Sequence, residues 1–239
     1  MTSDANYYLL NPDSFQIRIS TRQRRIMYRT FVDTFAIGPR STILDVGVTS
    51  DRTFENSNYL ESWHPHRQTI VALGIDDASF LQRTFDGVRF VRGNGLNLPF
   101  PPRSFDYVHC AAVIEHVGNV KNQCQLILEC ARVAQKGFFI ATPNRWFPVE
   151  VHTSLPLLHW LPKPWHRSVL RHLAYEFYSR EENLNLLNAK DLRRMTADLT
   201  SFQVCVLFAS LWGFRSNLML VGRRIMTSAS RTLKAPLNE

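Results

Sequence analysis

Short apolar segments recur along the chain at intervals too long for hairpins, and this spacing constrains the fold more than any other feature. The first five such segments are residues 42–46, 70–75, 88–91, 107–111 and 137–141. Intervals of about 18 to 30 residues leave room for a crossover, usually a helix, between parallel strands. Two further segments, 202–206 and 218–221, are separated by a short turn region at Trp212-Gly213. We therefore predict a doubly wound α/β fold with a seven-stranded mixed sheet, whose last strand is antiparallel because that turn is too brief for a parallel crossover.

Helix signals flank these segments. Residues 1–19 resemble an irregular arm, after which Ser20-Thr21 supply an N-cap and Gly38-Pro39 a stop for the first helix. Asn188, followed three residues later by Asp191, predicts the capped start of a short helix that reaches about Asp198. Before the fifth strand, helical spacing predicts a crossover helix with one apolar face made of Val120, Cys124, Ile127, Leu128, Ala131 and Ala134.

The fifth strand is followed by a segment of different composition. Residues 142–187 contain five prolines and the tryptophans Trp146, Trp160 and Trp165. Because prolines interrupt long helices, we expect loops and short helices that cover one end of the sheet. With 239 residues in all, the prediction is a single domain over residues 20–239 with a cover insertion at about 142–187.

Composition excludes several classes of protein. The chain is 45% hydrophobic and 20% charged, which excludes a disordered tail. Its longest apolar run, residues 204–209, is far shorter than a membrane-spanning helix. The N-terminus does not resemble a secretory signal, so we expect a cytoplasmic protein. Four cysteines without a CxxC pair, and histidines separated by prolines, lead us to predict no metal site.

Polar residues and glycines follow the predicted strands where a doubly wound sheet binds nucleotide-like ligands. Asp45 and Gly47 come at the end of the first strand, and Asp76 at the end of the second. A carboxylate in that second position can accept hydrogen bonds from both ribose hydroxyls. After the third strand, Asn94 could meet an adenine edge and Leu96 an adenine face. These positions together favour an adenosine-containing ligand.

Four segments in this order resemble the class I S-adenosylmethionine-dependent methyltransferases, in particular the methyltransferase type 11 branch: ILDVG, GIDDAS, VRGNGLNLPFPPRSFDYVH and AAVIEHV. The resemblance covers roughly residues 40–145 and implies a Rossmann-like fold that binds S-adenosylmethionine. It would place Asp45 and Gly47 at the methionine end, Asp76 at the ribose and Ala112 near the sulfonium. The adenine would lie at Asn94, Gly95 and Leu96. The segment ATPNRWFPVEVHTSLPLLHWLP also resembles a substrate-facing cover found in a bacterial subset of the family.

The chain departs from the family pattern in the loop after the first strand. The second glycine of the usual D-x-G-x-G is Thr49, and a β-branched residue does not readily take positive φ. The loop must therefore follow another backbone path or hold the cofactor less tightly. The insert that follows would supply such a path, with Ser57 capping a short helix.

The function predicted from these features is methyl transfer to a small-molecule or lipid-linked acceptor. Such an enzyme mainly aligns the acceptor and excludes water, and the candidates for a base are His116, Glu115 and His152. Glu115 and His116 could equally only cap a helix. The basic, amphipathic run of residues 165–173 would allow peripheral membrane contact.

Two other functions compete with this one. A methyltransferase-like scaffold that lost turnover through Thr49 is the alternative. A nucleic-acid methyltransferase is the less favoured possibility, because the expected Asn/Asp-Pro-Pro-aromatic segment is absent after the fourth strand, where Cys110-Ala111-Ala112-Val113 stands. Nucleic acid is accordingly not an expected partner.

Overall fold

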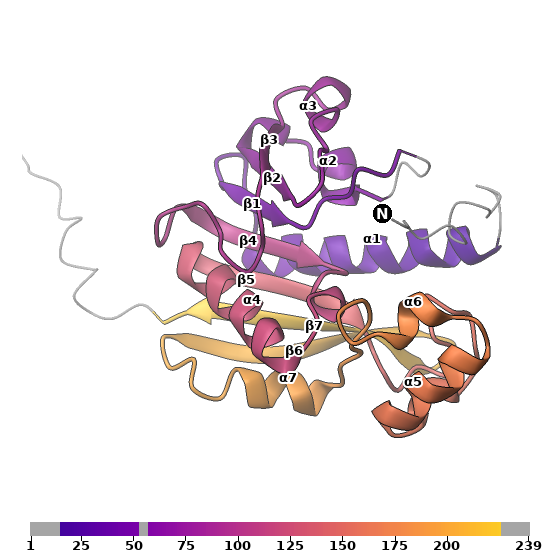
Figure 1. Ribbon diagram of the computed structural model, residues 1–239. Helices are drawn as coiled ribbons and strands as arrows, with labels where there is room; N and C mark the ends of the chain where they lie inside the picture. Colours follow the sequence, from indigo (N-terminus) through magenta and orange to yellow (C-terminus); the bar gives the residue numbers. More distant parts are fainter. Residues whose placement is uncertain (1–14, 53–56, 226–239) are drawn as a thin grey trace, which may run out of the picture.

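A single seven-stranded sheet organises the computed structural model, which describes residues 15–52 and 57–225 (Figure 1). Its strand order is β3-β2-β1-β4-β5-β7-β6. The strands are β1 (Ile43–Val46), β2 (Ile70–Gly74), β3 (Arg89–Arg92), β4 (Phe105–Ala111), β5 (Ala134–Pro143), β6 (Phe202–Leu211) and β7 (Phe214–Arg224). Strands β1 to β5 pair in parallel, and β7 is antiparallel to both of its neighbours, which confirms the predicted mixed sheet.

The antiparallel strand is a consequence of a two-residue hairpin. Trp212 and Gly213 join Leu211 to Phe214, with φ angles of 50° and 82°. Positive φ at both central residues is the geometry of a type I′ turn, whose twist matches that of the flanking strands. The short connection predicted from the sequence therefore reverses the chain direction.

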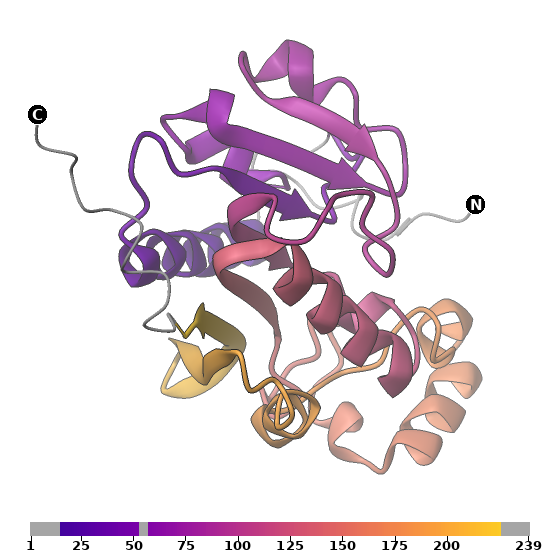
Figure 2. The same cartoon turned by 90° about the vertical axis from the view of Figure 1, so that its left-hand side faces the viewer.

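Helices cover both faces of the sheet (Figures 1 and 2). On one face, Phe31 and Phe35 of α1 (Phe15–Phe35) pack with Leu60 of α2 (Tyr59–Trp63) and Leu81 of α3 (Leu81–Thr84). On the other face, α4 (Val120–Val133) and α7 (Ala189–Met195) bury residues such as Leu126. The remaining helices are η2 (Arg67–Thr69), η3 (Ile114–His116), η4 (Leu158–Trp160), α5 (Lys163–His172) and α6 (Glu176–Ser179).

The predicted limits of the first helix were wrong. Helix α1 begins at Phe15, and the Thr21 hydroxyl donates to the Ile17 carbonyl (2.8 Å) inside the helix instead of capping it. Ile17 is buried, so core packing extends the helix into the predicted arm. The helix ends at Phe35, where Ala36 takes the left-handed conformation (φ 49°) that we expected of Gly38. Residues 1–14 of the arm lie outside the described residues.

The buried face of α4 also differs from the prediction. Val120 and Leu128 are about half exposed, whereas Gln123 is fully buried. The Gln123 amide donates to the carbonyls of Ile114 (3.1 Å) and Asn185 (2.8 Å), so a polar residue occupies the face that packs inward. An apolar periodicity could not reveal this.

Capping predictions had mixed outcomes. Asn188 and Asp191 form a capping box at the start of α7, as predicted, although the helix ends earlier, at Met195. Ser57 does not cap α2, because its hydroxyl donates to the Asp51 carboxylate (2.9 Å) and Asn58 occupies the N-cap position.

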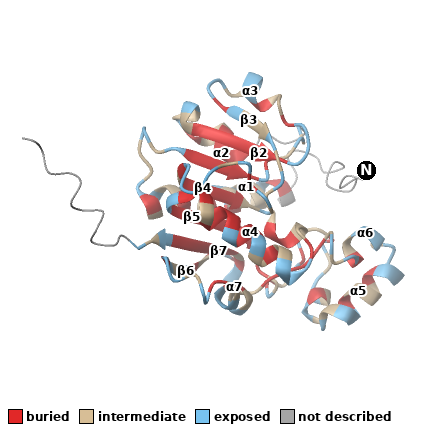
Figure 3. Ribbon diagram, turned by 60° about the vertical axis from the view of Figure 1, so that its left-hand side comes forward, coloured by how far each residue is buried: buried red, intermediate tan, exposed pale blue. Residues whose placement is uncertain are grey.

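The segment after β5 folds as predicted into loops and short helices. Figure 3 shows that buried residues concentrate in the sheet, while α5 and α6 project from it and carry a mixture of exposed, intermediate and buried residues. Within residues 15–52 and 57–225, no helix combines the length and apolar character needed to cross a bilayer.

Candidate active site

Strands β2 and β3 lie on one side of β1, and β4 and the later strands lie on the other side, so the topological switch point is between β1 and β4. In open α/β sheets, ligands bind at such a point, beyond the carboxyl ends of the strands. The predicted cofactor residues come from the ends of β1, β2, β3 and β4. The topology thus brings them to one edge of the sheet.

Gly47, directly after β1, packs closely against Val113, which follows the end of β4. Its φ is +93°, and a Cβ atom at this position would lie 2.1 Å from Cγ2 of Val113. Its N–H donates to the Leu73 carbonyl (2.7 Å) of β2. Only glycine combines this backbone conformation with so close a neighbour.

Thr49 takes a different course from the glycine of the family pattern. It is absent from the residues with positive φ. Its N–H donates to Oδ1 of Asn58 (2.9 Å), and Nδ2 of Asn58 donates back to the Thr49 carbonyl (3.1 Å). The loop therefore follows another backbone path, which Asn58 of the insert fixes. Of the two outcomes expected for this loop, the structure has the other backbone path, so strain at Thr49 gives no support to the scaffold alternative.

Asp45 belongs to a buried polar chain beneath this loop. The Tyr59 hydroxyl lies 2.8 Å from Nε2 of His109, and Nδ1 of His109 lies 2.6 Å from Oδ1 of Asp45. Burial raises the pKa of Tyr59, so its hydroxyl donates to Nε2, and Nδ1–H then donates to Asp45. Burial lowers the pKa of His109 to about 4, which keeps this imidazole neutral.

Glu61 of α2 completes this cluster and was missed by the sequence reasoning. It is fully buried, its carboxyl group interacts with that of Asp45, and neither oxygen has another hydrogen-bond partner among the described residues. Burial, and then the charge of Asp45, raise its pKa. Burial also raises the pKa of Asp45, to about 8. Two buried acids that raise each other's cost of ionisation are a site suited to a positively charged ligand group.

The rim of the site is more open. Asp76 is exposed just beyond β2, as is Ile75 beside it. Beyond β3, Oδ1 of Asn94 accepts a hydrogen bond from the Leu96 N–H (2.9 Å), which shapes the loop that carries both residues. A Cβ atom on Gly95 would lie 2.9 Å from Leu126, so this loop packs closely on α4.

Ala112 stands at the end of β4 in a strained conformation. Its φ of 56° is unusual for a residue other than glycine, and its N–H donates to the Ala141 carbonyl (2.9 Å) of β5. Strain of this kind clusters at functional sites.

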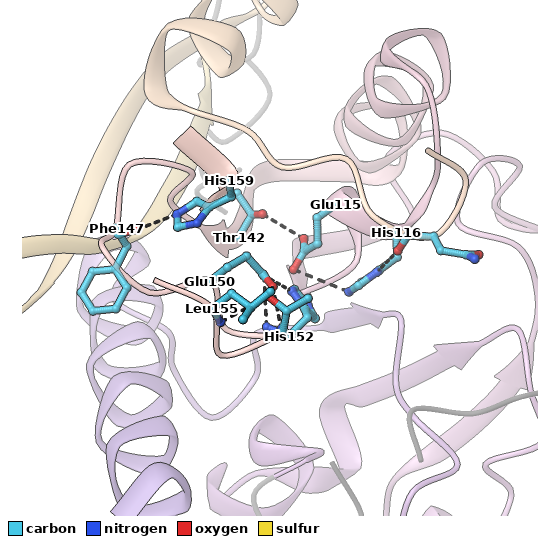
Figure 4. Close-up of polar contacts among 10 residues, drawn as sticks. Glu115, His116, Thr142, Phe147, Glu150, His152, Leu155 and His159 are labelled. Atoms are coloured by element: carbon cyan, nitrogen blue, oxygen red, sulfur yellow. Dashed lines mark hydrogen bonds and ion pairs between the residues drawn. The ribbon is translucent and has the colours of Figure 1, made fainter. Parts of the chain in front are cut away.

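The three candidate bases, which come from two segments of the chain, lie together (Figure 4). Glu115 is fully buried, and its Oε2 accepts from the Thr142 hydroxyl (2.9 Å). Nε2 of His116 is 4.0 Å from Oε1 of Glu115, and the rings of His116 and His152 meet edge to face at 4.8 Å. Spacing in the sequence gives no sign of this contact.

Glu150 holds His152 in place. Its Oε1 accepts from Nδ1 of His152 (2.6 Å), and its Oε2 accepts from the N–H (2.7 Å) and hydroxyl (2.8 Å) of Thr153. Burial alone would raise the pKa of Glu150, but His152 and these hydrogen bonds lower it to about 2. The carboxylate therefore stays ionised and fixes the loop between β5 and η4.

Residues of the cover attach to the ends of β4 and α4. Nδ1 of His116 donates to the Asn183 carbonyl (2.6 Å), the Asn185 N–H donates to the Glu115 carbonyl (2.7 Å), and Nδ2 of Asn185 donates to the Gly118 carbonyl (2.8 Å). The cover is thus anchored to the segment that carries Glu115 and His116.

Comparison with known proteins adds independent findings. Residues 44–141 match the family model described as a methyltransferase domain. No curated protein gives a significant sequence match to the chain.

Solved structures resemble nearly the whole chain. Magnesium protoporphyrin IX methyltransferase from Synechocystis, with bound S-adenosylhomocysteine, is 14% identical, with 92% of each chain covered and a TM-score of 0.56. A Burkholderia thailandensis 1,6-didemethyltoxoflavin-N1-methyltransferase, with bound 1,6-didemethyltoxoflavin and S-adenosylhomocysteine, is 12% identical over 92% of this chain and 86% of that one, with a TM-score of 0.57. At these identities the likeness is one of fold.

Proposed function

Residues 44–141 of this chain are a methyltransferase domain of the type 11 branch on the class I S-adenosylmethionine-dependent fold, and from that premise we propose that the enzyme methylates a lipid-linked or small-molecule acceptor held under its cover. S-adenosylmethionine is the expected cofactor. When bound, it supplies a methyl group on a sulfonium, which is an excellent leaving group. The protein then has to bind the acceptor, align it with the methyl group and exclude water from the site.

The observation that carries the proposal is the buried pair Asp45 and Glu61. Burial raises the pKa values of both acids, and the α-ammonium at the methionine end of the cofactor has the positive charge that would stabilise them as carboxylates. The residues present therefore fit the cofactor. Asp45, the less deeply buried of the two acids, would bind the ammonium, while Glu61 would interact with the Asp45 carboxyl group.

The remaining cofactor contacts follow from the rim. Exposed Asp76 can accept from the ribose hydroxyls without losing an existing partner in the described part of the chain. Asn94, Gly95 and Leu96 would line the adenine. Gly47 and Ala112 would border the reacting methyl group from two sides of the cleft.

The acceptor side is where His116 and His152 lie. We propose that both histidines contact the acceptor and, where the acceptor carries an acidic hydrogen, accept its proton. Glu115 is buried next to them. Their position on two anchored segments holds them in fixed orientation, which is what alignment of the acceptor requires.

Surface composition of the cover favours a lipid-linked acceptor over a freely diffusing one. Of the 14 large apolar side chains that are exposed within residues 15–52 and 57–225, eight lie between residues 146 and 177. They are Trp146, Val149, Val151, Leu157, Trp160, Trp165, Leu173 and Phe177. Exposed Arg171 lies on the same helix as Trp165, the combination of an interfacial helix.

Liposome co-sedimentation tests this membrane contact. We expect binding to vesicles that contain anionic lipid, and reduced binding for Trp165→Ala and Arg171→Glu. Trp212→Ala is the matched control, because Trp212 is equally exposed (63%, against 68% for Trp165) but lies on the β6–β7 hairpin. Equal loss in the control, or no binding by the native protein, leaves only the soluble acceptor.

A transfer assay tests the activity itself. Labelled methyl groups from S-adenosylmethionine should enter the organic phase of a lipid extract incubated with the protein, and Asp76→Ala should reduce the transfer. Label that enters only water-soluble compounds would refute the lipid-linked acceptor, and label that enters neither would refute the proposed activity on both acceptor classes.

A further inference from the structure

The side chains of Glu115, His116 and His152 have a property that base catalysis does not require. One potential ligand atom from each lies within 4.8 Å of the others. Two imidazole nitrogens and one carboxylate oxygen are a common ligand set of divalent transition metals, including catalytic zinc.

The hydrogen bonds of both histidines orient them as metal ligands. A carbonyl oxygen can only accept, so Nδ1 of His116 carries the hydrogen that Asn183 receives (2.6 Å). Nδ1 of His152 likewise donates to the ionised Glu150 (2.6 Å). In each neutral ring the lone pair is then on Nε2. Histidine ligands usually hold their second nitrogen in this way, against a carbonyl or a carboxylate.

Glu115 supplies the independent sign of a missing cation. Its side chain is fully buried, and while Oε2 accepts from Thr142 (2.9 Å), Oε1 has no hydrogen-bond partner in the described part of the chain. That unpartnered oxygen faces Nε2 of His116 at 4.0 Å (Figure 4). A buried carboxylate oxygen without a donor is costly, and a bound cation would remove the cost.

The spacing requires only a small adjustment. Two atoms bound to one tetrahedral zinc ion are about 3.3 Å apart, given bonds of about 2.0–2.1 Å. Ligand atoms that are as much as 4.8 Å apart must therefore approach each other by about 1.5 Å at most. The side chains of His116 and His152 are 35% and 17% exposed, which leaves the ion a path of entry.

We propose that Glu115, His116 and His152 form a binding site for a divalent transition metal ion of the zinc type, with at least one coordination position open toward the acceptor. This departs from the prediction of no metal, which considered histidine spacing within the cover and did not pair His152 with the end of β4. In the metal-bound protein the imidazoles are ligands rather than bases. The open position would take an oxygen or sulfur atom of the acceptor and lower its pKa, a role that rests on the proposed function.

Metal binding by purified full-length protein tests the site without any acceptor. After treatment with a chelator, the protein is loaded with Zn²⁺, desalted and measured by mass spectrometry for metal. We expect about one zinc ion per chain, and visible absorption bands of a coordinated ion when Co²⁺ is used instead. His116→Ala and His152→Ala should each lose most of the bound metal.

His172→Ala is the matched control. This exposed histidine lies in the cover and bonds through Nδ1 to the Ser168 carbonyl (2.8 Å), but it is outside the cluster. Glu115→Gln is a third variant, and thermal unfolding of each variant identifies those that fail to fold. Retention of zinc by folded His116→Ala and His152→Ala, or no zinc in the native protein, would overturn the proposal.

Calorimetry with S-adenosylhomocysteine keeps this result separate from the proposed function. The metal-free protein should bind S-adenosylhomocysteine as the native protein does, because the cluster is on the acceptor side. Zinc binding without S-adenosylhomocysteine binding would support the metal site and refute the methyltransferase function. The reverse result would refute the metal site alone.

Discussion

Replacement of Gly47 by alanine tests how the ends of β1 and β4 fit together. The new methyl group would meet two penalties, because φ at this position is +93° and Cγ2 of Val113 would be 2.1 Å away. Left-handed backbone costs an ordinary residue about 1–2 kcal/mol. Overpacking costs about 1–3 kcal/mol more. We therefore expect Gly47→Ala to lower the free energy of unfolding by about 2–5 kcal/mol.

Two other glycines separate these penalties. Gly213 also has positive φ (+82°) but has nothing within 4 Å of its Cβ position, so Gly213→Ala measures the backbone cost alone. Gly38 has neither constraint, so Gly38→Ala should be neutral or stabilise by up to about 1 kcal/mol. The double variant Gly47→Ala/Val113→Ala should regain the part due to overlap.

Urea unfolding followed by circular dichroism measures the stability of these four variants relative to the native protein. The affinity for S-adenosylhomocysteine is the second readout. The order of stability should be Gly38→Ala, then Gly213→Ala, then Gly47→Ala, and only Gly47→Ala should also weaken cofactor binding. The reasoning is refuted if Gly47→Ala is as stable as Gly213→Ala, or if removal of the Val113 methyl groups recovers nothing.

Three further predictions concern the cluster beneath this loop. The folded pKa of Asp45 (about 8) is above its ordinary value of 3.8, so the folded state binds the extra proton and stability should fall as pH rises from 4 to 8; Asp45→Asn should flatten that slope in urea unfolding, and an unchanged slope would contradict the assignment. A cationic ligand lowers the pKa of Asp45, so S-adenosylhomocysteine binding at pH 7 should release protons to the buffer. The heat of binding should then differ between Tris and phosphate, which have different heats of ionisation, and equal heats after subtraction of dilution heats would count against contact with Asp45. Because Thr49 is not in the left-handed region, Thr49→Gly should leave S-adenosylhomocysteine affinity unchanged or weaker, and tighter binding would show that strain was present.

The order and direction of the strands could be predicted because they depend on local signals. Strand spacing fixed the crossovers, Trp212-Gly213 fixed the hairpin, and Asn188 with Asp191 formed the predicted capping box. The start of α1 could not be predicted in this way. Burial of Ile17, which depends on tertiary structure, extends the helix beyond the local cap signal.

The residues of the site also differ in whether local sequence signals or tertiary contacts decide their positions. Asp45, Gly47 and Asp76 follow strands, so their common edge was predictable from the order of the strands. Glu61 lies in an insert without a recognisable motif, and only the fold buries it beside Asp45. The contact of His152 with His116 depends on a loop held by the Glu150 carboxylate, which no periodicity describes.

Binding of S-adenosylhomocysteine to the native protein and to Asp76→Ala, measured by titration calorimetry, tests the central claim most directly. Asp86→Ala is the control, since Asp86 is exposed between α3 and β3, near the amino end of β3 and not at the carboxyl ends of the strands. The account predicts one site in the native protein, unchanged binding in Asp86→Ala, and a loss of about 1–3 kcal/mol of binding free energy in Asp76→Ala, where a charged acceptor is removed. No binding by the native protein, or equal binding by Asp76→Ala, would contradict it.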